Sequence, residues 1–493
     1  MGAGAIKGLK RILCAGGIGA VLTGILAGCS FTIPLHLPPV PPGSAYTARR
    51  EPSKLVSERP GRQPQVLRYK AAARAPWWTL LRSSRLDALV RQALRDSPTI
   101  AAAQAQLREA RANMAINASL FYPQVTGTLS TARNRTSGAS FGGRIPGMTY
   151  SLFSGGVSVS YYPDFFGVNR LIYQGSRAQM LYQRDERDAA TLSLSGNVVG
   201  TAVDVAATRA EIEATQRSVR DERALLALRR AQYAGGGVPF GAVISQRSAL
   251  LAAQARLVPL RQKLAVYWHQ LAILAGAFPG QWRVRPLTMA ELREPAVIPV
   301  ALPSALVRHR PDIRAATEQM RSAIARIGVA RAQFFPTVML SASFGTSTLD
   351  AGQFFNPISR IWGLAADLVQ PIFEGGKLRA QERAAYAAFD TTFALYRSVV
   401  LDAFGQVANA LRALEHDARA ERVDEEALMA ARATRSLARA GYRSGSTNYL
   451  AVLTADEGVQ SARVTLVQGK AQRLQDTVAL FIALGGDDWG ARP

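Results

Sequence analysis

The sequence is poor in cysteine and in long apolar segments. It contains two cysteines, Cys14 and Cys29, and after Gly28 no apolar run reaches the roughly 20 residues that a membrane-spanning helix needs. If the chain crosses a bilayer, it must therefore do so as β-strands. Cys14 lies inside the apolar part of a leader, so we expect a mature chain without a disulfide whose stability comes from packing.

The sequence also lacks the residue patterns of an enzyme or of a metal site. Its histidines show no metal-ligand spacing, and no loop of the GxxxxGK type is present to hold a phosphate. The histidines are His36, His269, His309 and His416. Because no cysteine remains to act as a nucleophile, we expect no enzymatic activity, no bound metal and no cofactor.

The first 28 residues are typical of a secretory signal. Three cations precede an apolar run over residues 12–28, and this run ends in "LAGCS". That ending resembles the lipobox of bacterial lipoproteins, where the signal is cut before the cysteine and the cysteine is acylated. Residues 1–28 are thus predicted to be the signal peptide and Cys29 the lipidated residue. An ordinary signal with an incidental cysteine is the alternative. Ser30 favours sorting to the outer membrane.

The chain is strongly basic. Its formal net charge of +24 falls to +21 once the three leader cations, Lys7, Lys10 and Arg11, are removed. Because the arginines are dispersed and an exported chain meets no genome, we expect a surface that faces anionic lipid or anionic solutes rather than nucleic acid. Residues 29–76 are rich in proline and arginine, which predicts a lipid-anchored, extended N-terminal segment.

The sequence contains an internal duplication at an offset of about 209 residues. The segment "RDSPTIAAAQAQLREARANMAINASLFYPQV" returns as "RHRPDIRAATEQMRSAIARIGVARAQFFPTV", "YYPDFFG" as "VQPIFEG" and "LAILAG" as "LFIALG". Such landmarks in one order predict two versions of one structural unit. We assign the first repeat to residues 77–285, the second to residues 286–485 and a C-terminal tail to residues 486–493.

Each repeat is predicted to contain a helix, two strands, a long helix, a tight turn and a second long helix. In the second repeat, apolar side chains recur every three or four residues, close to the seam of a coiled coil. These side chains are Phe389, Phe393, Tyr396, Val400, Phe404, Val407, Leu411 and Leu414. The long helices are predicted at about 170–234, 242–275, 376–441 and 450–484.

The predicted strands alternate apolar residues with small polar ones, which indicates one apolar face. The apolar sets are Val125, Gly127 and Leu129; Val157, Val159 and Tyr161; Val338, Leu340, Ala342 and Phe344; and Trp362, Leu364, Ala366 and Leu368. This pattern matches a transmembrane barrel, although a half-buried soluble sheet shows the same alternation. Four strands cannot close a barrel with an open lumen, so oligomerisation is implied.

Longer segments carry a family resemblance. "PWWTLLRSSRLDALVRQALRDSPTIAAAQAQLREAR", "LPSALVRHRPDIRAA" and the turns beginning "YAGGG" and "YRSGS" resemble the outer-membrane factor family of TolC-like channels, in particular its NodT-type lipoprotein branch. The resemblance implies a mainly α fold with transmembrane β-strands, in which a homotrimer forms one 12-stranded β-barrel continued by a long α-helical periplasmic tunnel.

The same resemblance implies a function and partners. The chain is expected to be the outer-membrane exit channel of a tripartite efflux pump, anchored by lipid and extending into the periplasm. Its partners would be a periplasmic adaptor and an inner-membrane transporter, which must supply the energy. Drugs, solvents or metal ions would pass through it unaltered.

In this family the turn between the long helices lies at the periplasmic end of the tunnel. The resemblance places the two turns at Tyr233 to Gly236 and at Tyr442 to Gly445, where the adaptor is expected to dock. Glycine accepts positive φ, so a purely structural role at these reversals stays open.

The resemblance also implies a constriction after the second turn. Leu450 matches a position that forms an apolar constriction in relatives, and hydrophobic rings can close pores by dewetting. Ordinary coiled-coil packing is the alternative role. Relatives often carry gate aspartates one and four residues later, where this chain has Ala451 and Thr454, so an acidic ring there is not expected.

The nearest carboxylate to this position is Asp456, whose equivalent in the first repeat is Arg247. Around a pseudo-sixfold ring the two positions would alternate in sign, although most such charges are solvated. Phe240 and Tyr449 complete the candidates for the channel gate at the tip.

Two other functions stay open on sequence grounds. A type I protein-secretion duct would use the same architecture to pass polypeptides. A lipid-anchored coiled-coil scaffold would leave the alternating strands unexplained. The lipobox and the NodT-like segments favour small-molecule efflux. The substrate is not predicted, because an exit duct selects little.

Overall fold

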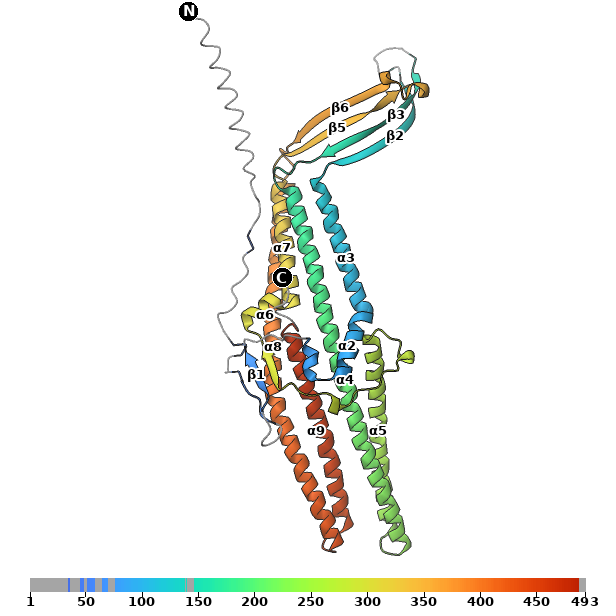
Figure 1. Ribbon diagram of the computed structural model, residues 1–493, viewed down its shortest axis with the longest axis vertical. Helices are drawn as coiled ribbons and strands as arrows, with labels where there is room; N and C mark the ends of the chain where they lie inside the picture. Colours follow the sequence, from blue (N-terminus) through green and yellow to red (C-terminus); the bar gives the residue numbers. More distant parts are fainter. Residues whose placement is uncertain are drawn as a thin grey trace, which may run out of the picture. The chain divides into compact units, whose positions relative to one another are not determined.

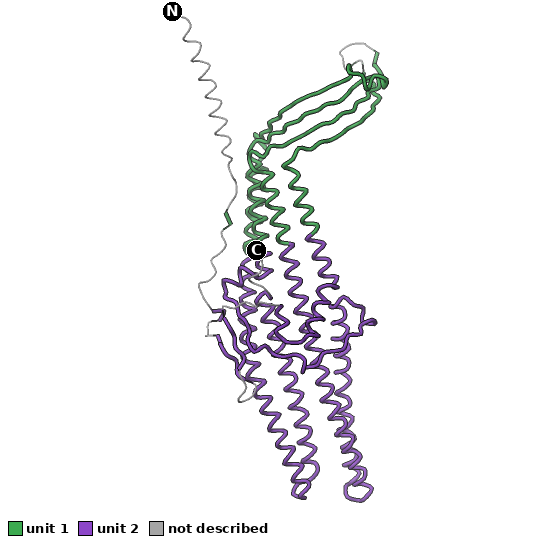
Figure 2. Tube along the Cα trace, in the orientation of Figure 1, with its two compact units in different colours: residues 1–37, 108–182, 317–395 green, residues 38–107, 183–316, 396–493 purple. Residues whose placement is uncertain are grey.

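The computed structural model describes residues 34–35, 45–47, 51–57, 64–69, 76–137, 139 and 146–486 (Figure 1). The predicted signal peptide, Cys29 and the tail after Gly486 lie outside these residues. The chain divides into two compact units (Figure 2). Unit 1 combines residues 1–37, 108–182 and 317–395, and unit 2 combines residues 38–107, 183–316 and 396–493. None of the helices within the described ranges has both the length and the hydropathy of a membrane-spanning segment.

The same order of elements occurs twice along the chain. The first copy contains α3 (Pro98–Ala118), β2 (Gln124–Thr136), β3 (Met148–Tyr161), α4 (Val168–Ala234) and α5 (Phe240–Leu274). The second contains α7 (Pro311–Ala332), β5 (Thr337–Thr348), β6 (Arg360–Val369), α8 (Lys377–Arg443) and α9 (Tyr449–Ala483). A shorter helix precedes each copy: α2 (Ser84–Asp96) and α6 (Pro303–His309). The long helices match in length, with 67 residues in α4 and α8 and 35 in α5 and α9.

The prolines shared by the two copies mark element boundaries. Pro98 and Pro311 are the first residues of α3 and α7, where the missing N–H of proline costs no hydrogen bond. Pro123 and Pro336 stand immediately before β2 and β5. Each proline of a pair therefore marks the same element boundary in both copies.

Unit 1 contains an antiparallel sheet in the order β2-β3-β5-β6. Its register aligns Val125 with Val159, Val159 with Ala342 and Ala342 with Leu364, so one apolar residue from each strand lies in a single row. Directly opposed residues share a face, and successive residues alternate between faces. The register therefore confirms the predicted apolar face, on which Trp362 remains 75% exposed. The other face carries small polar residues such as Ser158 and Ser343.

Unit 2 has its own core. Trp77, in the short 3-10 helix η1 (Trp77–Leu81), stacks on Phe481 of α9 with ring centroids 5.5 Å apart. Its indole N–H donates a hydrogen bond to Ser195 Oγ of α4 at 3.4 Å. Both aromatic rings are almost fully buried, so this contact fastens α9 and α4 to the segment before α2.

The sequence patterns did not predict a second, small sheet in unit 2. Strand β1 (Val66–Tyr69) pairs in parallel with β4 (Val297–Val300). Leu67 of β1 and Ile298 of β4 are aligned with each other, and both are buried. The segment before η1 is thereby attached to the connection between the two copies. Four-residue strands are too short to show a period of two in a proline-rich sequence.

A buried arginine holds this small sheet against the helices of unit 2. Arg473 of α9 is 2% exposed. One of its Nη atoms lies 2.6 Å from Glu421 Oε2 of α8 and 3.1 Å from Glu294 Oε2, and the other donates to Gln65 Oε1 at 3.1 Å. Gln65 in turn donates to the Pro295 carbonyl at 2.6 Å. A guanidinium with five N–H donors can serve several elements at once, and here it joins α8, α9 and the flanks of β1 and β4.

We expect Arg473→Ala to lower the free energy of unfolding of the full chain by about 3–5 kcal/mol, because Glu421 would be left as a buried, poorly compensated charge. Arg463→Ala, on the same helix, is the matched control and should cost less than about 1 kcal/mol, because within the described ranges the side chain of Arg463 makes a single hydrogen bond, of 3.4 Å, to Gln460. Denaturant unfolding followed by circular dichroism measures both. Equal losses in the two variants would contradict this role for Arg473.

Candidate functional site

The two turns between the long helices have the same backbone geometry. Gly236 and Gly445 adopt positive φ angles of 71° and 76°. The next residue donates its N–H to the carbonyl five positions earlier, from Gly237 to Gln232 and from Ser446 to Gly441, at 2.8 Å in both turns. This is the pattern of a helix end closed by a left-handed glycine. The two glycines are therefore needed to reverse the chain.

An aromatic pair bridges each turn. The rings of Tyr233 and Phe240 lie 5.4 Å apart between centroids, and those of Tyr442 and Tyr449 lie 5.0 Å apart. The four positions are equivalent between the copies. Phe240 and Tyr449, predicted as gate candidates, thus lie beside the turn tyrosines and join the ends of successive helices. The structure brings all the predicted turn residues together at their own turns.

The first helix pair, α4 and α5, is held mainly by apolar packing. Its buried cluster consists of Ile212, Val219, Leu226, Val243, Leu250, Ala253 and Leu257. Beside this cluster, Gln246 of α5 donates a hydrogen bond of 2.5 Å to Glu222 Oε2 of α4. Burial raises the pKa of Glu222, and Gln246 opposes that shift.

The second pair, α8 and α9, is joined by a smaller apolar cluster and by ion pairs between side chains. The cluster consists of Leu428, Val459 and Leu466. Asp456 of α9 lies 3.0 Å from Arg439 and 3.8 Å from Arg435, both on α8, and its side chain is 15% exposed. In the first copy the positions of Arg439 and Asp456 are held by Arg230 and Arg247, which cannot form an ion pair. Arg247 is exposed on α5. Asp456 thus forms its ion pairs within one chain, with arginines of the neighbouring helix α8.

Leu450 and Thr454 lie on the first turns of α9. Leu450 is 57% exposed, and the Thr454 hydroxyl donates to the Leu450 carbonyl at 3.1 Å. Both residues line a shallow groove between α8 and α9, together with Thr434 and Asn448. Asn448 caps α9 by accepting a hydrogen bond from Ala451 N at 3.1 Å. The cap fixes where α9 begins, and Leu450 is the large apolar side chain that remains uncovered beside it.

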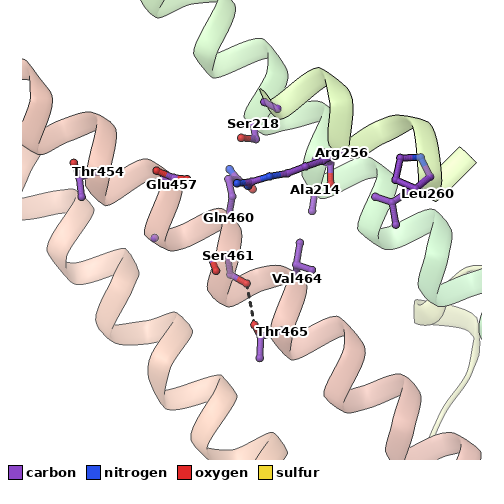
Figure 3. A pocket seen from close by; sticks show the side chains of 14 residues that line it. Ala214, Ser218, Arg256, Leu260, Thr454, Glu457, Gln460, Ser461, Val464 and Thr465 are labelled. Carbon is purple, nitrogen blue, oxygen red and sulfur yellow. Dashed lines mark hydrogen bonds between the residues drawn. The ribbon is translucent and has the colours of Figure 1, made fainter. Parts of the chain in front are cut away.

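A cavity of about 680 Å³ separates the two helix pairs within unit 2. Its walls come from α4, α5 and α9, and they include Ser218, Pro259, Glu457 and Gly458. In Figure 3 the side chain of Arg256 extends from α5 toward Gln460 of α9. Sequence reasoning missed this cavity. The small residues spaced three or four apart on α9, from Gly458 to Ser461 and Thr465, were the available signal.

The surroundings of this cavity are electropositive. Burial lowers the pKa of Arg463 on α9, and the nearby Arg217, Arg432 and Arg435 lower it further. Burial raises the pKa of Asp221 on α4, with Asp456 adding to the rise while Arg439, Arg220 and Arg435 oppose it. Arginines therefore outnumber carboxylates around Asp456, which does not suit a cation-binding acidic ring.

The sequence matches known proteins along most of its length. The family model described as outer membrane efflux protein matches residues 89–277 and 302–486, one segment in each copy. OpmQ of Pseudomonas putida, a pyoverdine export outer membrane protein, is 29% identical over 467 residues, which cover 92% of this chain and 98% of OpmQ. CusC of Escherichia coli K12, a cation efflux system protein, is 26% identical over 414 residues, covering 84% of this chain and 89% of CusC.

Solved structures share the fold. A membrane protein from Pseudomonas aeruginosa superposes with a TM-score of 0.81 at 25% identity, covering 93% of this chain and all of that one. The outer-membrane channel OprN superposes with a TM-score of 0.80 at 24% identity, covering 91% of this chain and 100% of OprN. These likenesses confirm the predicted TolC-like fold class, in which strands form a barrel and long helices form a tunnel.

The duplicated order of helices and strands, the sheet with one apolar face, and the family match in both copies all agree. Members of this family are outer-membrane efflux channels that extend into the periplasm, and such channels are not enzymes. The chain belongs to the outer membrane efflux protein family and is an outer-membrane efflux channel.

Proposed function

We propose that this chain forms the homotrimeric exit channel of a tripartite pump and that it closes at the second helix turn by an apolar ring of Leu450 side chains. The relatives export or expel pyoverdine, cations and solvents, which supports small, chemically diverse cargo. A periplasmic adaptor docks around the two turns, and an inner-membrane transporter supplies the energy. The observation that carries the gate assignment is the contrast between exposed Leu450 and ion-paired Asp456.

The unpaired edges of the sheet support the proposed trimer. Strands β2 and β6 are the outermost of the four in the described part of unit 1. Each therefore presents backbone N–H and C=O groups without a partner strand, and such groups are costly to leave unpaired in lipid. Edge-to-edge pairing of copies satisfies them, and three copies supply twelve strands.

We expect detergent-extracted protein to have roughly three times the mass of the 53.0 kDa chain without its signal. Light scattering coupled to size-exclusion chromatography, corrected for bound detergent, measures this mass. A monodisperse monomer that still conducts ions in planar bilayers would contradict the trimer.

The anchor is proposed at Cys29. The residue follows "LAG" at the end of a secretory signal and lies outside the described residues. Several acyl chains on one cysteine hold a protein to a membrane far more firmly than a single chain does.

We expect Cys29→Ser to abolish both acylation and cleavage before residue 29. Intact-mass analysis of the purified wild-type protein should show the mass of the chain from Cys29 plus acyl groups. Cys14→Ser is the control and should leave that mass unchanged. A wild-type mass without acyl groups would remove the claim.

The cavity between the helix pairs supports movement of the second pair. The cavity is partly open to solvent, and along it α9 is not packed continuously against α4 and α5. The α8–α9 pair also has the smaller apolar cluster. Near the turn, the ion pairs of Asp456 with Arg439 and Arg435 are partly exposed, and exposed pairs of this kind are worth about 0.2–1 kcal/mol. We therefore assign the moving part of the gate to α8 and α9.

We expect Leu450→Ala to raise single-channel conductance, because the shorter alanine side chains leave a wider opening that water can enter. Arg439→Gln is the matched control and should leave the closed state largely intact. Thr454→Asp should create block by a trivalent cation added on the periplasmic side, which the wild type lacks. Single-channel recording in planar bilayers compares all four proteins.

Two results would overturn the apolar gate. The first is strong block of the wild type by the trivalent cation together with no effect of Leu450→Ala. The second is opening by Arg439→Gln alone, which would assign the closed state to the Asp456 ion pairs.

A further inference from the structure

The four strands of unit 1 contain few charged side chains, and these are strongly segregated. They are Arg133 and Arg135 on β2, and Arg360 and Asp367 on β6. The three arginines lie toward the strand ends that are joined by the connections 137–147 and 349–359. Asp367 lies near the opposite end, where the strands join helices. The cations therefore gather at one end of the sheet.

The register places the three arginines on the apolar face. Residues 125, 127, 129, 131, 133 and 135 alternate onto one side of β2, so Arg133 and Arg135 share the face of Leu129. Leu129 is aligned with Gly155, Gly155 with Thr346, and Thr346 with Arg360, so Arg360 is on this face too. The arginines thus continue the side of the sheet that faces lipid.

At this end of the sheet, most of the other side chains on the same face are serines and threonines. From the Arg360 row to these strand ends, its other positions are Thr131, Thr149, Ser151, Thr346 and Thr348, together with Leu129, Phe153 and Gly155. The boundary is abrupt, since Trp362 directly follows the Arg360 row on β6. Arg133, Arg135, Arg360 and these hydroxyl residues are called the arginine collar below.

The collar has no carboxylate partner within the part of the chain that the structure describes. Arg133, Arg135 and Arg360 are exposed and form no ion pair there. Asp350 is the acid in the neighbouring connection, and its Oδ1 accepts a hydrogen bond from Gly352 N at 3.0 Å. Three exposed guanidiniums on one face, uncompensated by acid, make a surface for an anion.

Apolar groups lie next to the collar. Phe354 packs on Gly155, where an added Cβ would come within 2.7 Å of its ring, so the connection 349–359 folds onto the apolar face. In that connection Phe355 is 89% exposed, and Ile358 is similarly uncovered. An amphiphile with an anionic head would satisfy both kinds of group, whereas a free anion would leave the apolar ones in water.

We propose that the arginine collar binds the phosphate groups of the phosphorylated lipid in the outer leaflet of the outer membrane. The helices of this channel extend into the periplasm, so the opposite strand ends face the exterior. Guanidinium groups bind phosphate oxygens in pairs, and serine and threonine hydroxyls can donate further hydrogen bonds. The collar thereby fixes the depth of the barrel at the outer headgroup level, above the apolar band that ends at Trp362.

The test measures binding of bisphosphorylated lipid A to the full-length protein in an uncharged detergent, by native mass spectrometry and by fluorescence titration. The variant is Arg133→Gln/Arg135→Gln/Arg360→Gln. The matched control is Arg108→Gln/Arg111→Gln/Arg379→Gln, which removes three exposed arginines from helices of unit 1. We expect binding to weaken on the order of 100-fold in the collar variant and to stay within about two-fold in the control.

Three further measurements identify the ligand and distinguish a loss of binding from misfolding of the triple variant. Dephosphorylated lipid A should bind the wild type on the order of 100-fold more weakly, and millimolar inorganic phosphate should not displace lipid A. The single variants Arg133→Gln and Arg360→Gln, which disturb the sheet least, should each cost about five-fold. Equal binding by wild type and collar variant, equal binding of dephosphorylated lipid, or displacement by inorganic phosphate would each overturn the proposal.

Discussion

Backbone groups in lipid must find partners within protein, and this constraint dominates the architecture. One chain supplies a sheet of only four strands in its described part. The outward backbone N–H and C=O groups of the edge strands β2 and β6 find no partner strand within that sheet. Pairing between copies removes both edges and makes the assembly symmetric. Each long helix then occurs once per copy, so any side chain at a helix turn is repeated around a common axis. In the proposed trimer, the exposed Leu450 would be repeated three times around that axis for this reason.

The duplication provides two helix pairs of equal length that are held together differently. The pair α4–α5 has seven buried apolar residues and the Gln246–Glu222 hydrogen bond. In the second copy, Ala455 and Ala431 occupy the positions of Gln246 and Glu222. The ion pairs of Asp456 join α8 and α9 there instead. Apolar packing resists separation at any salt concentration, whereas partly exposed ion pairs are screened by salt. Near their turns, the two pairs thus differ in what holds them together: apolar packing and a hydrogen bond in the first, and fewer apolar contacts with ion pairs in the second.

Periodic features were predictable from sequence because one physical cause sets each period. The alternation along β5 and β6, the prolines that begin α3 and α7, and the glycine turns at Gly236 and Gly445 all follow local rules of backbone geometry. The partners of charged residues were not predictable in this way. Arg473 joins segments hundreds of positions apart, and Asp456 pairs with Arg439 and Arg435, which project from the facing helix α8. Such choices depend on tertiary neighbours.

Charge placement along the chain follows the medium that each part meets. The rows of Val125 and Gly127 on the apolar face carry no acid or base, and the arginines begin with Arg360 in the row of Leu129. In unit 2, Arg217, Arg432 and Arg435 instead lie near Arg463 on the long helices. The net charge of +24 is therefore spread over separate environments and is not one nucleic-acid-like patch. Each group of arginines has to be explained by its own surroundings: lipid headgroups at the collar, and aqueous solutes near the helix turns.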